Sequence, residues 1–252
     1  MKIKNYIILD DKFSSKEIGL SLIGDLIIPT PNYDYEEVQI LGADGSLFRK
    51  KGLKDMSLDL EFNFKIDKPI SVISREIRKF FKGKKKLILS WNNEVYYKIK
   101  KIEISEISSE LKKIGLFTVS FILDPYSYLI SNFWLDITSL KEINNIYDLS
   151  LPLLRVTGSG NINIQINTNQ ISLKSASGIV IIDGENMLCY TNEKLNFNEN
   201  MTGYYPEIIE GKNTLSFEGN ITKIELLPNW RYLWLIFMIL QKQNFRIMEY
   251  VL

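Results

Sequence analysis

Apolar and polar residues alternate with a period of two along most of the chain, which predicts β-strands. The clearest run covers residues 56–64, where five apolar side chains share one face of the predicted strand and polar side chains occupy the other. Residues 117–123 repeat this pattern just before Asp124 and Pro125, which we expect to end that strand. The first half of the chain is therefore expected to be mainly β.

Residues 94–107 also predict a strand, but their apolar positions change parity in the middle. Tyr97 and Ile99 have one parity and Ile102 the other, with Lys100 and Lys101 between them. A β-bulge inserts one extra residue into a strand and would return both groups to the same face. We therefore expect a bulge near Lys100 and Lys101.

One stretch, residues 71–82, has apolar residues at helical spacing, with Ser71 placed to cap its start and Gly83 to close its end. This predicts a single amphipathic helix packed on a sheet. The cations that follow the helix allow two interpretations, a nucleic-acid patch or a solvated helix end whose charges complement the helix dipole, and we favour the second. These cations are Lys82, Lys84, Lys85 and Lys86.

In the second half the predicted strands become short, and glycine or asparagine interrupts them every several residues. The glycine-rich stretch 158–160, for example, is expected to be a hairpin turn between two strands rather than a phosphate-binding loop. Frequent turns of this kind are typical of an all-β sandwich. We therefore expect two domains, residues 1–130 and 131–233, with the boundary between Tyr126 and Leu151.

Composition narrows the classes of function. The 252 residues include 31 Lys and Arg, 30 Asp and Glu, no His and one cysteine, Cys189. A net charge of +1 does not suit a dedicated duplex nucleic-acid binder. The lack of His excludes imidazole-dependent triads and metal sites. A single cysteine permits no internal disulfide, and we expect Cys189 to be a buried strand residue of a chain made in a reducing compartment.

The sequence also argues against a membrane protein and against an enzyme. The first apolar run is too short for a signal peptide, and the longest apolar stretch, residues 233–240, is far shorter than the roughly 20 residues that cross a bilayer. No nucleophile with a base, phosphate loop or metal cluster occurs at recognisable spacing, so we expect no catalytic residue, no cofactor and no metal. Acidic pairs such as Glu36-Glu37 are better explained as solvated surface than as glycosidase carboxylates.

Four aromatic residues of the second half are candidates for stacking on a saccharide, because Trp and Tyr rings pack against sugar faces. Large aromatic side chains also fill sandwich cores and subunit contacts, and we favour this second interpretation. The candidates are Trp134, Tyr204, Tyr205 and Trp230.

Five segments of the first half follow one another in a recognisable order. They are residues 41–47 (Leu-Gly-Ala-Asp-Gly-Ser-Leu), the strand 56–64, the helix end 79–87, residues 90–97, and residues 117–128, which run from a strand into Asp124-Pro125-Tyr126. No single motif is specific, but in their order and spacing these segments resemble the siphophage distal tail protein family, the hub at the tip of long non-contractile phage tails.

The second half matches more loosely, through residues 205–208 (Tyr-Pro-Glu-Ile), 211–214 (Gly-Lys-Asn-Thr) and 228–231 (Pro-Asn-Trp-Arg). It resembles the galectin-like or carbohydrate-module-like C-terminal β-sandwich of these proteins. The resemblance implies a mainly β fold: an N-terminal β-sandwich with one α-helix and an extended hairpin, followed by that C-terminal sandwich.

The resemblance also implies a structural function. The first domains would form a hexameric ring that joins the tail tube to the tail-tip and receptor-binding proteins, at the tail tip of a phage or prophage particle assembled in the host bacterial cytoplasm. Its partners would be other copies of itself and these tail proteins. Near-neutral charge suits a lumen that passes DNA without holding it. The alternatives are a carbohydrate-binding module for host-surface attachment and the equivalent hub of a phage tail-like bacteriocin.

Two turn motifs are the candidate ring contacts, one where glycines permit positive φ and one at the expected domain junction. A third segment, residues 234–252, departs from the family pattern. It is apolar, and we expect it to pack on its own sandwich or on a neighbouring subunit, because exposed apolar surface promotes aggregation. The residues of the two turn motifs are Gly42, Asp44, Gly45, Asp124, Pro125 and Tyr126.

Overall fold

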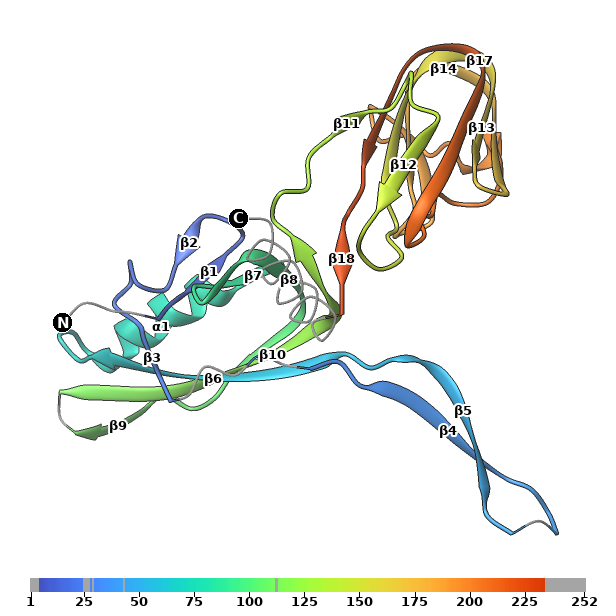
Figure 1. Cartoon of the computed structure of the whole chain (residues 1–252). Helices are drawn as coiled ribbons and strands as arrows, with labels where there is room; N and C mark the ends of the chain where they lie inside the picture. The colour runs from blue at the N-terminus through green and yellow to red at the C-terminus, as the bar shows by residue number, and fades with distance from the viewer. Residues whose placement is uncertain (1–4, 25–27, 29, 43, 112, 234–252) are drawn as a thin grey trace, which may run out of the picture. The chain divides into compact units, whose positions relative to one another are not determined.

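The computed structural model of the chain describes residues 5–24, 28, 30–42, 44–111 and 113–233. These residues are mainly β-strand with one α-helix among them, which confirms the expected fold class (Figure 1). The chain divides into two compact units, one formed by the residues up to Ile130 and the other by Ser131–Tyr232. The expected apolar extension, residues 234–252, lies outside the described residues.

The first unit is built on one antiparallel sheet with the strand order β2-β1-β7-β8-β10-β6-β3, and β9 pairs with β10. Two further strands, β4 and β5, pair only with each other. The elements in chain order are β1 (Ile7–Leu9), β2 (Phe13–Ser14), β3 (Ser21–Ile23), β4 (Tyr33–Gln39), β5 (Ser46–Leu53), β6 (Met56–Lys65), α1 (Ile70–Phe81), β7 (Lys86–Leu89), β8 (Asn92–Ile104), β9 (Ser108–Leu111) and β10 (Ile114–Leu129).

Helix α1 covers the apolar face of this sheet. β6 buries every second side chain, and β10 does the same along most of its length, so the alternation predicted for residues 56–64 and 117–123 is confirmed. The ring of Phe81 on α1 lies 6.1 Å from the ring of Phe62 on β6 and 6.1 Å from that of Phe121 on β10. A fully buried aromatic side chain contributes about 2–3 kcal/mol to stability, so this cluster holds the helix to the sheet.

The prediction that Asp124 and Pro125 end the strand is wrong. β10 continues through both residues to Leu129. The ladder between β10 and β8 shifts register between Leu123 and Ser127, so Pro125 lies where the pairing is interrupted. A proline has no N–H to donate, and such an interruption is one of the places where a strand tolerates it.

The predicted bulge is confirmed. Ile122 of β10 pairs with Lys101 of β8 and the next residue, Leu123, pairs with Ile99, which leaves Lys100 as the extra residue. A bulge bends a strand and increases its twist. The sheet curls accordingly, with α1 on its concave side (Figure 1).

The sequence predicted the end of helix α1 correctly but not its beginning. It starts at Ile70 after Pro69, with no capping hydrogen bond from a side chain, so the expected cap by Ser71 is wrong. Its end agrees with the prediction: the strand-like Lys82 is followed by Gly83 with φ of +69°. That left-handed conformation suits glycine best and commonly stops a helix.

The second unit is also an antiparallel sheet, with the order β11-β17-β13-β14-β15. β12 pairs with the beginning of β17, and β16 pairs with β14. Its elements are β11 (Leu135–Asp136), β12 (Glu142–Asn145), β13 (Leu153–Ile166), β14 (Asn169–Asp183), β15 (Leu188–Thr191), the short 3₁₀ helix η1 (Asn198–Asn200), β16 (Met201–Gly203), β17 (Gly211–Leu227) and β18 (Arg231–Tyr232).

Two expectations about the second unit are wrong: that all of its strands are short, and that residues 158–160 form a hairpin turn. β13, β14 and β17 have 14, 15 and 17 residues, where short strands were expected. The stretch 158–160 lies inside β13 at register shifts, and is not a hairpin turn between two strands. Gly158 faces Gly178 across the ladder, and a Cβ on Gly158 would lie 2.4 Å from the carbonyl oxygen of Asn220. Glycine here lets the strands bend and approach closely.

The bend folds the sheet over a single core. Ile164 and Leu215 from one half of the long strands belong to the same buried cluster as Leu154 and Ile224 from the other half. Cys189 on β15 is part of it and is 1% exposed, which confirms the expected buried strand cysteine. Burial of apolar side chains on both inner faces is what a β-sandwich requires.

A clasp joins the two ends of the second unit. The side-chain oxygen of Asn132 accepts a hydrogen bond from the N–H of Trp230 (2.9 Å), and its Nδ2 donates to the carbonyl of the same residue (3.4 Å). Just beyond, Leu135 of β11 pairs with Leu226 of β17. The chain therefore enters and leaves this unit at the same place.

Candidate assembly surfaces

The β4–β5 hairpin is the part of the first unit with the least internal support. Among the residues that the structure describes, its strands pair only with each other, and neither strand contains a buried side chain. An isolated two-stranded ribbon is marginally stable in water. A ribbon of this kind gains stability when another surface covers it.

Apolar side chains are exposed on both faces of the hairpin. Val38 and Leu47 lie opposite each other and are 43% and 57% exposed. Phe48 follows Leu47 and points to the other face, because successive side chains of a strand alternate. Clustered exposed apolar surface marks sites of protein association. The large exposed apolar residues of this segment are Tyr33, Tyr35, Val38, Ile40, Leu41, Leu47 and Phe48.

The first predicted turn motif forms the connection at the end of this hairpin. Gly42 and Gly45 have φ of +84° and +86°, the left-handed conformation that was expected of them. Asp44 is exposed between them, and the side chain of Leu41 is fully exposed. The motif therefore presents the apolar side chain of Leu41 at the end of the ribbon.

Charged residues are divided between the two strands of the hairpin. Glu36 on β4 pairs with Lys51 on β5 (3.6 Å), and Asp34 on β4 pairs with Lys54 just after β5 (3.3 Å). Exposed ion pairs contribute about 0–1 kcal/mol each. These contacts favour one register of the ribbon while leaving its apolar side chains uncovered.

The second predicted turn motif has a different environment. Asp124 Oδ1 accepts hydrogen bonds from the N–H of Tyr126 and the hydroxyl of Tyr128, both at 3.1 Å, and Asp124 Oδ2 lies 3.7 Å from Lys100 Nζ. Pro125 is buried and Tyr126 half-buried. Asp124 therefore stabilises the irregular part of β10. The Gly42–Gly45 motif, in contrast, is exposed, so the two motifs do not form one surface.

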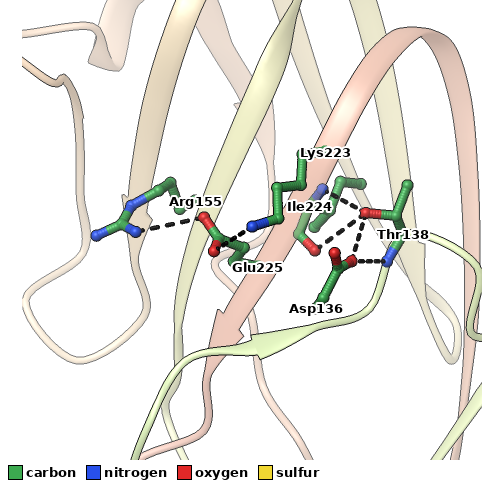
Figure 2. A network of polar contacts seen from close by, with 6 residues as sticks. All are labelled: Asp136, Thr138, Arg155, Lys223, Ile224 and Glu225. Atoms are coloured by element: carbon green, nitrogen blue, oxygen red, sulfur yellow. Dashed lines mark hydrogen bonds and ion pairs between the residues drawn. The ribbon is translucent and has the colours of Figure 1, made fainter.

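Trp134, the first glycan candidate, is half-buried beneath a cation. The guanidinium carbon of Arg155 lies 4.0 Å from the centre of the Trp134 ring. Arg155 is in turn bound by Glu225 (3.3 Å), and Lys223 pairs with the other oxygen of the same carboxylate (2.7 Å), as Figure 2 shows. One face of the Trp134 ring is thus already occupied by Arg155.

The other three glycan candidates differ in how far their side chains are exposed. Trp230 and Tyr205 are partly buried and pack against the core of the second unit. Trp230 also contacts the ring of Tyr147, with 5.9 Å between ring centres. Tyr204 is 65% exposed. Within the described residues no ring contact joins any two of the four candidates, so they do not form one aromatic platform.

A second part of the polar network shown in Figure 2 ties β11 to β17. Asp136 Oδ1 accepts hydrogen bonds from the hydroxyl and the N–H of Thr138, and the hydroxyl of Thr138 accepts the N–H of Ile224 (2.9 Å). The hydrogen bond from the Thr138 hydroxyl is the main reason why the pKa of Asp136 lies below its usual value. The hydrogen bond from Lys223, followed by that from Arg155, lowers the pKa of Glu225 in the same way.

Three further properties of the described residues concern metal binding, the Cys189 thiol and membrane spanning. No group of three or more Asp, Glu or Cys side chains among them is placed to hold a metal ion. Burial raises the pKa of the Cys189 thiol to about 11, so it is a poor nucleophile at neutral pH. No helix in this part of the chain is both long and apolar enough to span a membrane.

Sequence reasoning found the glycines at the end of the hairpin but missed its exposed apolar side chains. Both parities of residues 33–39 mix apolar and charged side chains, so no buried face can be assigned. The mixture of apolar and charged residues on both faces could have identified the exposed hairpin, because a strand that packs on a core shows one clean apolar face.

No protein-family model matches the chain, and no curated protein matches its sequence. Its structure is similar to the crystal structure of the SPP1 Dit (gp 19.1) protein, described as a paradigm of the hub adsorption apparatus in phages that infect Gram-positive bacteria. The match covers 91% of this chain and 99% of the other, with a TM-score of 0.64 and 12% sequence identity. The resemblance expected from the sequence is thus confirmed at the level of the fold, which is that of a siphophage distal tail hub.

Proposed function

We propose that this chain is a structural protein of a siphophage tail, the distal hub whose copies form a hexameric ring between the tail tube and the tail-tip and receptor-binding proteins. The observation that carries the proposal is the fold match, which extends over nearly the whole of a known hub protein. The equivalent position in a phage tail-like bacteriocin would require the same ring. This role is not enzymatic and uses no cofactor.

The hairpin supports the assembly part of the proposal. Val38, Leu47 and Phe48 leave apolar surface on both faces of a ribbon that pairs with no other described strand of the first unit. In a ring, a neighbouring copy would cover this surface, and the glycines at positions 42 and 45 would shape the end of the ribbon.

The experiment is light scattering on the size-exclusion peak of the purified protein, with negative-stain images of the same fraction. A mass near that of six chains, together with ring-shaped particles, is expected. A monomer at every concentration tested would contradict a ring that forms unaided, and the measurement would then be repeated with the tail tube protein added.

A second candidate function, binding of a host-surface saccharide, has one favourable observation: the ring of Tyr204 is 65% exposed. Glycan binding through this residue should change the tyrosine fluorescence or the thermal midpoint when cell-wall saccharide is added. The Tyr204→Ala variant should lose that change. No response to any cell-wall glycan would exclude this function.

A further inference from the structure

The lysine run after α1 is not uniformly solvated, although the sequence favoured that interpretation. Lys84 Nζ lies 3.6 Å from Asp10 Oδ2, and Lys86 Nζ lies 3.0 Å from Asp11 Oδ2. Asp10 Oδ1 also accepts the N–H groups of Lys85 (2.9 Å) and Lys86 (3.0 Å), which fixes the backbone of the loop. Two of the four lysines, Lys84 and Lys86, are therefore paired with carboxylates within the first unit.

Three other cations at this end of the helix are different. Arg78, Lys82 and Lys85 are exposed, and none has an ion pair with a residue that the structure describes. They line an open hollow of about 270 Å³, together with the half-buried Ile102 and Ile104 of β8. The C-terminal end of a helix carries about half a negative charge, which offsets only part of three positive charges. Three other lysines of the lining, Lys84, Lys100 and Lys101, each have a carboxylate partner. The hollow thus carries three positive charges, those of Arg78, Lys82 and Lys85, that no carboxylate of the described residues pairs with.

Two carboxylates on the opposite side of the sheet also have no counter-charge. Asp59 and Glu61 on β6 are exposed and point away from the buried face that α1 covers. Their neighbours across the ladder on β10 are Ser120 and Thr118, which are uncharged. Neither carboxylate forms an ion pair with any residue in the described parts of the chain.

These two surfaces are complementary in charge and lie on opposite sides of one compact unit. The cationic hollow is on the side of α1, because residues of its last turn form part of the lining. Two different surfaces on opposite sides of a protein are what a head-to-tail contact requires, and head-to-tail contacts that close generate rings.

We propose that the hollow lined by Arg78, Lys82 and Lys85 receives the Asp59 and Glu61 carboxylates of a second copy of this chain. The inference rests on the proposed ring and names one contact that orients its subunits. Complementary charges at an interface fix the register of the partners and suppress wrong pairings more than they add affinity.

Nucleic acid is a less suitable occupant of the hollow. Asp10 and Asp11 lie next to the lysine loop, and Asp55 is bound to Lys100, another residue of the lining. A polyphosphate strand that continued past the hollow would meet these carboxylates. A pair of carboxylates on a neighbouring strand is small enough to be bound without that repulsion.

Charge reversal on each side tests the contact. The basic-side variant is Lys82→Glu with Lys85→Glu, and the acidic-side variant is Asp59→Lys with Glu61→Lys. Each variant alone places like charges opposite each other, and we expect the concentration for half-assembly to rise on the order of ten-fold or more. A one-to-one mixture of the two variants should assemble like the wild type, because alternating copies bring opposite charges together at every contact.

The control for the basic-side variant has the same change of net charge in the second unit, Lys141→Glu with Lys174→Glu, both at exposed positions. It should assemble normally, and circular dichroism should show that all variants are folded. Assembly is measured by light scattering over a concentration series, and rising salt should weaken it.

The outcomes separate this inference from the proposed function. If the wild type assembles and both reversed variants assemble equally well, the contact is wrong and the ring stands. If each reversed variant fails to assemble and the mixture fails too, the two surfaces do not face each other, and the inference is also wrong. Binding of a single-stranded DNA oligonucleotide that only the basic-side variant loses would assign the hollow to nucleic acid instead. A wild type that stays monomeric both alone and with the tail tube protein contradicts both the ring and this contact.

Discussion

The ring of Phe64 on β6 covers Gly115, the residue directly opposite it on β10. A Cβ at position 115 would lie 2.1 Å from Cζ of that ring. Phe64 is 5% exposed and is packed 5.9 Å from the ring of Phe117, so it has little room to move. We expect Gly115→Ala to lower the free energy of unfolding by about 1–3 kcal/mol, the usual effect of overpacking a core.

The measurement is urea unfolding followed by circular dichroism. The matched control is Gly52→Ala on β5, where a Cβ meets no atom within 4 Å and φ is not positive. Replacing a strand glycine by alanine at such a position should be neutral or stabilise the protein by up to about 1 kcal/mol. Equal effects of the two substitutions would show that the Phe64 ring does not require a glycine.

Val38→Lys should reduce assembly without changing the stability of the monomer. Val38 is 43% exposed on a ribbon with no core beneath it, so the charge is tolerated in the free protein and excluded from an apolar contact. Light scattering should show a lower mass, while the thermal midpoint stays within about 2 °C, because an exposed substitution changes stability by less than about 0.5 kcal/mol. Leu195→Lys, at a 64% exposed position of the second unit, serves as the control. Full assembly of Val38→Lys would remove this face of the hairpin from the ring contact.

Acid should weaken the contact between β11 and β17. The pKa of Asp136 in the folded protein lies below its ordinary value of 3.8, first because of the Thr138 hydroxyl and then because of the Thr138 N–H. A carboxyl group with a lowered folded pKa binds fewer protons in the folded state, so its contribution to stability is complete above pH 3.8 and is lost as the pH falls through the folded value. The advantage of the wild type over Thr138→Val should therefore shrink between pH 6 and pH 3.

Urea midpoints at several pH values within that window measure the effect. Asp136→Asn cannot ionise, so introducing Thr138→Val into that variant should remove the same stability at every pH. A difference between wild type and Thr138→Val that does not change with pH would contradict the role of the Asp136 carboxylate.

Cys189 should resist modification in the folded protein. Its side chain is 1% exposed, and burial raises the pKa of the thiol to about 11, so little thiolate is present at pH 8. Ellman's reagent at pH 8 should react with it orders of magnitude more slowly in the native protein than in guanidinium chloride. Rapid native reaction would mean that β15 opens easily.

Sequence patterning predicted those elements whose burial follows a local rule. Residues 56–64 and 117–123 bury alternate side chains against one helix, and the predicted bulge falls at Lys100. Gly83 ends the helix, as its position indicated. In each case the residue type and the spacing alone determine which face is buried or where the regular backbone stops.

The wrong predictions at Gly158 and Pro125 share one physical cause, which is that glycine and proline mark irregular backbone but do not show whether the strand reverses or bends there. Gly158 was interpreted as part of a reversal, but it lies where a long strand bends while its ladder continues. Pro125 was interpreted as the end of a strand, but it lies in a register shift. Whether a strand reverses or bends is decided by its partner strands, which are distant in sequence.

The candidate surfaces show the same limit. The acids at positions 59 and 61 were already placed on the polar face of a predicted strand, and the cations after the helix were visible as a run. Sequence could not show that Lys84 and Lys86 are neutralised by Asp10 and Asp11 while Lys85 is not, because those partners lie more than 70 residues away.

The clasp between Asn132 and Trp230 has a consequence for how such a protein can evolve. Because the chain enters and leaves the second unit at adjacent points, a different domain with closely spaced ends can replace that unit by recombination without any change in the length of the flanking chain. Closely spaced termini are the property that makes domain insertion tolerable. The second unit therefore has the closely spaced ends that exchange of a whole domain requires.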